Sequence, residues 1–208
     1  PQAVAHTIAE QRSPARAGAI FLACAIVFHA VFGFAVGLFG GWDTALMDTV
    51  KAPLIAVASL LLCFPSLYVF ACVGGTPLSI AQAFVLGASC LAMIGLLLVG
   101  LAPVAWLFAV STESVAFVAV LTLAIWLVAT AFAIRYIIKL EVIDIFRRTP
   151  GIKFWFLVFV LVTLQMATCM RPLLTKLDTG WWVPEKKFFL LHFTETMEEI
   201  DQPVEPPG

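Results

Sequence analysis

The stretch from Ala17 to Gly41 contains no Lys, Arg, Asp or Glu. An α-helix needs about 20 consecutive apolar residues to cross the hydrocarbon core of a membrane, so this stretch is long enough to span. Of the 208 residues, 62% are apolar and 12% are charged, and the mean hydropathy is +1.04. Soluble domains are usually about 45–50% apolar and about 25% charged. The chain is therefore predicted to be a multi-pass membrane protein.

Four further apolar stretches follow, at about Pro53–Val73, within Leu78–Val110, at Val115–Ile134 and at Ile152–Met170. The third is longer than a membrane core requires, and we expect Pro103 to kink it or to end it before a short interfacial piece. No Asp, Glu, Lys or Arg is expected inside the core of any span. The predicted fold class is all-α: a polytopic membrane helix bundle with five transmembrane helices and a short interfacial C-terminal helix.

The composition changes along the chain and divides it into four segments. These are an N-terminal polar tail (1–16), the five-span transmembrane domain (17–171), an interfacial aromatic tail (172–200) and a disordered end (201–208). In the aromatic tail, Trp181 and Trp182 suit the membrane interface. Phe189 and Phe193 are spaced to share one face of a short helix. We expect this tail to contact the membrane surface or a partner protein.

Residues at every fourth position of the first stretch form a doubled G-x-x-x-G pattern: Ala25, His29, Gly33, Gly37 and Gly41. Residues four apart share a helix face, and small residues let helix backbones approach closely in lipid. The four small residues therefore predict a helix-packing face, whose partner is either another helix of this chain or another subunit. Because alanine is also small, Gly33→Ala is expected to disturb this face less than Gly37→Leu.

His29 lies on the same face, near the middle of its predicted span. An ionisable residue inside a membrane is a functional hypothesis by default. A proton relay through His29 would need a second ionisable group, and none is expected in the span cores. A metal site would need several ligands, and the sequence pattern does not cluster them near His29. We favour a neutral, hydrogen-bonded packing histidine. The alternative is axial ligation of haem or chlorophyll, which requires one histidine with small neighbours to admit the ring.

The second stretch carries Ser59, Cys63 and Ser66 at positions that share a face, with Pro65 in the middle of the span. A proline inside a helix is expected to kink it, and the freed carbonyls can be satisfied by Ser66 or by a neighbouring helix. A broken helix of this kind can line a transport path. A single kink without a charged residue is more often part of the architecture, so Ser59, Pro65 and Ser66 are candidates for a path or only for a kink.

Several short segments resemble a group of uncharacterised bacterial polytopic proteins that are similar to the Yip family of five-helix membrane proteins. They are KAPL at 51–54, LCFPSLYVF at 62–70, GG with LS and QA at 74–83, and QM with MRPL at 165–173. The resemblance covers about residues 42–196. It implies five spans, and it carries no catalytic residues to transfer.

Basic residues near the span ends predict the orientation, since cytoplasmic loops carry more Lys and Arg. Seven lie on the side of the N-terminus: Arg12, Arg16, Arg135, Lys139, Arg147, Arg148 and Lys153. Five lie on the other side: Lys51, Arg171, Lys176, Lys186 and Lys187. We expect a cytoplasmic N-terminus and an outside C-terminus in a cell membrane, the bacterial inner membrane. Trp42, Trp106 and Trp155 lie at predicted span ends and are expected at the interfaces.

The sequence contains no motif that would carry catalysis, such as a P-loop, G-x-G-x-x-G or H-E-x-x-H. The net charge is −1, and no basic stripe predicts nucleic-acid binding. We expect a non-enzymatic integral membrane subunit that acts as a scaffold or assembly component of a larger complex. Its partners would be membrane lipids and other membrane-protein subunits. The alternatives are a transporter or channel component and a haem- or chlorophyll-binding accessory subunit that uses His29.

Cysteine labelling tests the orientation in a background without native cysteines. Thr112→Cys should react with an impermeant thiol reagent added from outside, and Thr149→Cys should react only after the membrane is permeabilised. These results follow because residue 112 precedes the fourth predicted span and residue 149 follows it. A reagent that reaches residue 149 but not residue 112 from outside would show that the orientation is inverted.

Overall fold

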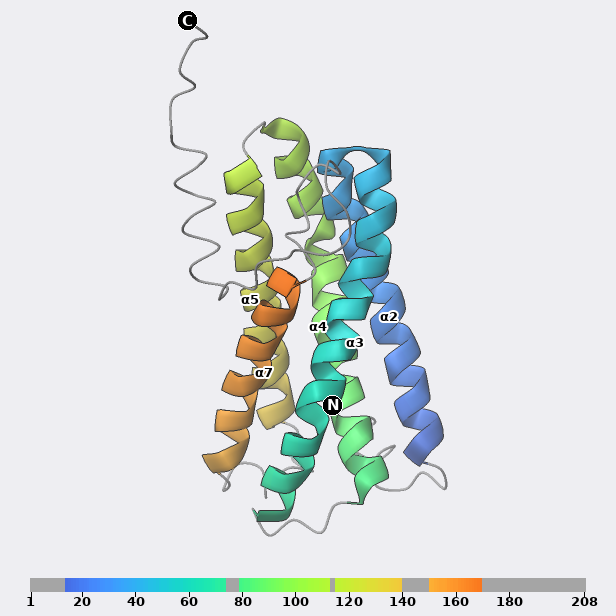
Figure 1. Ribbon diagram of the computed structural model, residues 1–208, viewed down its shortest axis with the longest axis vertical. Helices are drawn as coiled ribbons and strands as arrows, with labels where there is room; N and C mark the ends of the chain where they lie inside the picture. The colour runs from blue at the N-terminus through green and yellow to red at the C-terminus, as the bar shows by residue number, and fades with distance from the viewer. Residues whose placement is uncertain (1–13, 74–78, 113–114, 140–149, 170–208) are drawn as a thin grey trace, which may run out of the picture.

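The computed structural model describes residues 14–73, 79–112, 115–139 and 150–169. The elements in chain order are α2 (Pro14–Gly37), the 3₁₀ helix η1 (Leu38–Gly40), α3 (Trp42–Val73), α4 (Ile80–Ser111), α5 (Val115–Lys139) and α7 (Pro150–Cys169). The long helices stand side by side as a bundle (Figure 1). The prediction of an all-α fold is confirmed for the described part of the chain.

Four of these helices are long and apolar enough to cross a membrane. Their apolar spans are Ala15–Gly40, Trp42–Phe70, Ile80–Phe108 and Phe117–Arg135. In α7 the apolar part among the described residues is shorter, from Phe154 to Met166. This length is below the roughly 20 residues that a span requires. The prediction of five spans is therefore corrected to four candidate spans among the described residues, which still indicates a multi-pass membrane protein.

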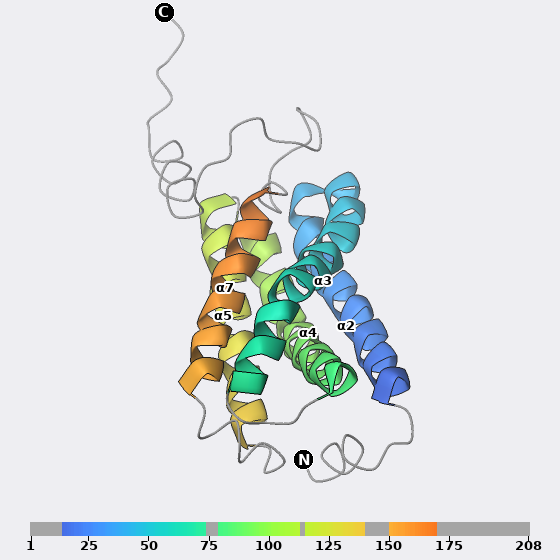
Figure 2. The same cartoon turned by 60° about the horizontal axis from the view of Figure 1, so that its bottom comes forward.

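Helices α2, α3 and α4 form the centre of the bundle. Helix α2 packs along both α3 and α4, while α5 packs on α4 and α7 packs on α3. In both views α2 lies on one side of α3 and α4, and α5 and α7 lie on the other (Figures 1 and 2). Gly18 of α2 lies against Phe84 of α4, and His29 lies against Gly95. The two contacts advance together along both chains, so α2 and α4 run parallel.

Helix α3 begins at Trp42, well before Pro53, where the second span was expected to start. Pro53 and Pro65 both lie inside this helix, since membrane helices tolerate proline where the freed backbone groups find other partners. The early start brings Asp48 and Lys51 into the apolar span Trp42–Phe70. The expectation of span cores without charged residues applies to a span that starts at Pro53, whereas both residues lie in the early part of this longer candidate span.

Helix α4 runs from Ile80 to Ser111 without a break at Pro103. Its first turn begins with a capping box. The backbone N–H of Gln82 donates to Ser79 Oγ at 3.2 Å, and the backbone N–H of Ser79 donates to Gln82 Oε1 at 2.9 Å. Such a box satisfies two backbone donors at a helix start. With 32 residues at about 1.5 Å each, α4 is longer than the roughly 30 Å hydrocarbon core, so it tilts or extends beyond that core.

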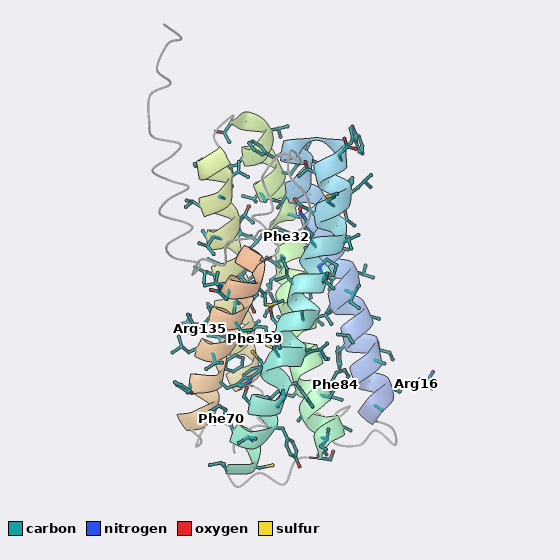
Figure 3. The ribbon with its side chains drawn as sticks, viewed as in Figure 1. Arg16, Phe32, Phe70, Phe84, Arg135 and Phe159 are labelled. Atoms are coloured by element: carbon teal, nitrogen blue, oxygen red, sulfur yellow. The ribbon has the colours of Figure 1, made fainter. Side chains whose placement is uncertain are left out.

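The three tryptophans expected at span ends fall into two groups. Trp42 and Trp106 are 72% and 48% exposed, whereas Trp155 is only 2% exposed. The Trp155 indole Nε1 donates to the carbonyl oxygen of Cys63 at 2.9 Å, which joins α7 to α3. Phe70 of α3, which is labelled in Figure 3, also meets α7: its ring centroid lies 6.0 Å from that of Phe154. Trp155 therefore joins two helices, whereas the sequence predicted that it lies at the membrane–water interface.

Gly41 forms the turn between η1 and α3. Its φ of +101° and ψ of 179° belong to a backbone region that is essentially restricted to glycine. The Gly41 amide donates to the Leu38 carbonyl at 3.2 Å, and its carbonyl accepts from the Ala45 amide at 3.0 Å. A Cβ placed on Gly41 would meet no atom within 4 Å. Gly41 was predicted to belong to the helix-packing face, but it is a turn residue, because α2 has ended before it.

We predict that Gly41→Ala lowers the free energy of unfolding by about 1–3 kcal/mol, because the backbone conformation and not the available space is limiting. Thermal unfolding in mild detergent measures the effect. Gly100→Ala is the matched control, since a Cβ added to this helical glycine would also meet nothing within 4 Å. That control should be neutral or slightly stabilising, because alanine favours helix. Equal unfolding temperatures for the two variants would contradict the turn geometry.

Candidate functional site

Two glycines of α2 face α3 at very short range. A Cβ on Gly37 would lie 2.7 Å from Cα of Ala45, and one on Gly33 would lie 2.8 Å from Cβ of Ala52. The Gly33 Cβ would also collide with the backbone carbonyl of Asp48. The two backbones therefore meet as closely as small residues allow. The partner of this face, which the sequence leaves open, is α3 of the same chain.

His29 lies one turn earlier on α2 and is 5% exposed. Its Nδ1 lies 2.8 Å from the carbonyl oxygen of Ala25, which is itself fully buried. Because a carbonyl only accepts, Nδ1 carries the proton and donates. A Cβ on Gly95 of α4 would lie 2.9 Å from this same nitrogen. The imidazole is thus held between its own helix and α4, in the packing role favoured from the sequence.

Asp48 is the buried acidic residue of the described helices. Its side chain is 1% exposed, and both carboxyl oxygens are buried without a hydrogen-bond partner. The one other buried side-chain oxygen in this state, within the described residues, is Thr130 Oγ1 of α5. An unpartnered buried polar group is costly, and a charged one far more so. Asp48 is therefore the residue that calls most strongly for a functional explanation.

The hydroxyl groups on either side of Asp48 are occupied elsewhere. Thr44 Oγ1 donates to the Gly40 carbonyl at 3.2 Å, and Thr49 Oγ1 donates to the Ala45 carbonyl at 2.7 Å. Lys51, about one turn further along α3, is partly buried and does not hydrogen-bond the carboxyl group. The carboxyl group of Asp48 is thus left without a donor although three polar side chains lie within four residues of it.

The sequence contains a signal that would have found Asp48. Ala52, Ala56, Ser59 and Cys63 form a stripe of small residues, and one turn before Ala52 this stripe reaches Asp48. Asp48, Ala56, Ser59 and Cys63 are all buried. A span that starts at Pro53 leaves Asp48 outside the membrane, among the charged residues that precede the proline. A stripe extended across that proline would have placed Asp48 on the packed face of α3.

The serines proposed for a kink or path in α3 donate hydrogen bonds to backbone carbonyls of their own helix. Ser59 is fully buried, and its Oγ donates to the Ile55 carbonyl at 2.8 Å. Ser66 Oγ donates to the Cys63 carbonyl at 2.7 Å, the same oxygen that accepts from Trp155. Pro65 lies inside the helix on its exposed side. The structure therefore brings Ser66 to the α7 contact, leaves Pro65 on the exposed side of α3, and joins neither of them to Asp48.

The aromatic tail residues Trp181, Trp182, Phe189 and Phe193 lie outside the described residues, so their expected role stays a prediction. Within the described ranges, no three His, Cys, Asp or Glu side chains are grouped as metal ligands. Comparison of the chain with protein-family models, with curated proteins and with solved structures finds no match. The resemblance to the Yip family therefore stays a hypothesis.

We predict that Gly33→Ala lowers the free energy of unfolding by about 1–3 kcal/mol, a typical cost of overpacking. The added methyl group would meet the backbone of Asp48, which cannot rotate away as a side chain can. Gly33→Ala is still expected to cost less than Gly37→Leu, because alanine is the smaller residue. Thermal unfolding in mild detergent measures it, again against Gly100→Ala. Wild-type stability of the Gly33 variant would show that α2 and α3 are further apart than described.

Proposed function

We propose that this protein is a non-enzymatic multi-pass membrane subunit that acts as a scaffold or assembly component of a larger membrane complex. The supporting observation is the way the outer helices attach to the centre. Helix α5 packs on α4 and α7 packs on α3, and among the described residues these two outer helices make no extensive contact with each other. Each outer helix therefore keeps apolar faces for lipid or for helices of other subunits.

The uncovered surface of these helices is strongly apolar. Phe132 of α5 is 58% exposed, and Phe154 and Leu157 of α7 are 56% and 54% exposed. In a bilayer such side chains can face lipid without cost, since lipid chains are as apolar as leucine. Among the other described helices, α7 packs extensively only on α3, so much of its apolar surface is left uncovered. A neighbouring subunit would give α7 the packing that its own chain does not supply.

The buried hydroxyl groups support a structural rather than a catalytic role. Ser59 and Thr163 each donate to a carbonyl four residues earlier on the same helix, at 2.8 Å. A nucleophile needs a base within hydrogen-bond reach, and these hydroxyl groups are committed to the backbone instead. The arrangement of these two hydroxyl groups supports a role in helix structure rather than in catalysis.

The glycine face of α2 is used inside the chain, so it does not serve as the docking surface for another subunit. The proposed partner contact therefore moves to the outer helices and to the aromatic tail, residues 172–200. The pigment-binding alternative is not favoured, because His29 is covered by its own helix and by α4. The transporter or channel alternative is favoured by one specific observation, the buried carboxyl group of Asp48.

We predict that deletion of residues 181–208 releases the protein from its complex while the described helices stay inserted. The reason is that this tail carries four large aromatic side chains that suit a partner: Trp181, Trp182, Phe189 and Phe193. Purification in mild detergent followed by identification of the co-purified proteins measures the effect. Full-length protein with Trp181→Ala and Trp182→Ala separates loss of these side chains from loss of chain length.

Two results would contradict the scaffold proposal. One is a truncated protein that keeps the same co-purified subunits in the same ratio. The other is a full-length protein that runs alone as a monomer under the mildest conditions. In either case the transporter or channel component becomes the leading function.

A further inference from the structure

Asp48 lies inside a candidate span and out of reach of water. It is six residues after Trp42, the first residue of α3, which corresponds to about 9 Å along the helix axis. The side chain is 1% exposed. The backbone of Asp48 is also the surface against which Gly33 of α2 packs. The carboxyl group is thus buried at the position where α2 and α3 come closest together.

The protonation state of this group is decided by its surroundings. An ionised carboxylate in an apolar interior is strongly unfavourable unless it is paired and hydrogen-bonded. Neither oxygen of Asp48 has a hydrogen-bond partner, and the neighbouring hydroxyl groups of Thr44 and Thr49 donate to carbonyls of their own helix. The neutral, protonated carboxyl group avoids the charge penalty in this packing.

We propose that Asp48 is a membrane-embedded proton-binding site, protonated while α2, α3 and α4 are packed and able to release its proton to water only when these helices separate. The inference goes beyond a scaffold role, because it gives the helix packing a dependence on pH. The ligand is a proton rather than a metal cation, since hard cations such as Ca²⁺ require about six or more oxygen ligands. A proton requires only the one carboxyl group.

The titratable groups around Asp48 are few, and each can be named by its element. On α3 they are the exposed Asp43 and the partly buried Lys51. On α2 His29 lies one turn from Gly33 and donates to the Ala25 carbonyl. Neither η1 nor residues 96–102 of α4, which follow the His29 contact at Gly95, contain an ionisable side chain, and the same holds for residues 154–167 of α7. Lys51 and His29 are therefore the two groups whose charge can influence Asp48.

The test uses the full chain in lipid nanodiscs and measures thermal unfolding from about pH 5 to about pH 9, a range that includes the titration of buried carboxyl groups. Folding favours the neutral form, so wild-type stability should fall as pH rises through the titration of Asp48. Asp48→Asn keeps the shape without the charge and should remove this fall. Asp43→Asn is the matched control on the exposed side of the same helix, and it should behave as wild type.

Infrared difference spectra over the same pH range give a second, direct readout. Wild type and Asp43→Asn should show the C=O band of a protonated carboxyl group at low pH and its loss at high pH, and Asp48→Asn should lack that band. The proposal is overturned if Asp48→Asn keeps the wild-type pH dependence. It is also overturned if Lys51→Met unfolds the protein at neutral pH as a broken ion pair would, or if Na⁺ at constant pH stabilises wild type but not Asp48→Asn.

Discussion

In a lipid bilayer the hydrophobic effect does not drive helices together, because the acyl chains are as apolar as the side chains. Association inside a bilayer therefore depends on how closely backbones can approach. In this protein that approach occurs where Gly33 and Gly37 of α2 meet the backbone of Asp48 and Ala45 on α3. Gly41, with its positive φ, reverses the chain so that α3 returns along α2. Helices α4 and α7 pack on the pair that this contact holds together, and α5 packs on α4.

Helix α4 extends the same principle to a third member of the centre. Gly18 of α2 receives Phe84, and Gly95 of α4 receives His29 and Phe28, so each helix supplies glycines that fit bulky groups of the other. The outer helix α7 is attached differently, by a hydrogen bond from Trp155 to the Cys63 carbonyl and by aromatic contacts. Directional bonds of this kind are modest in membranes. The centre is thus held by shape, and α7 is held by a few specific contacts.

The pattern of apolar residues was sufficient to predict the all-α class and the approximate place of each helix, because hydropathy depends only on local composition. It was not sufficient for boundaries near proline. Pro53 looked like a helix start, yet α3 begins at Trp42, since membrane helices tolerate proline where the freed backbone groups find other partners. The four-residue spacing of Gly33 and Gly37 predicted a packing face, but a periodicity does not name its partner. The prediction placed Trp155 at a membrane interface for a similar reason. Its burial against α3 depends on how the helices assemble, which local sequence does not specify.

The same early turns of α3 also explain why Asp48 was overlooked and why it matters. A carboxyl group near a lysine and a proline is typical of a solvated loop, whereas the Asp48 side chain is 1% exposed and its backbone packs against Gly33. Glycine is what makes that sealing possible, because any side chain at residue 33 would hold α2 away from the Asp48 backbone. The tight packing of α2 against α3 and the burial of Asp48 therefore depend on each other. A charge that appears on Asp48 acts directly on the contact that the rest of the bundle depends on.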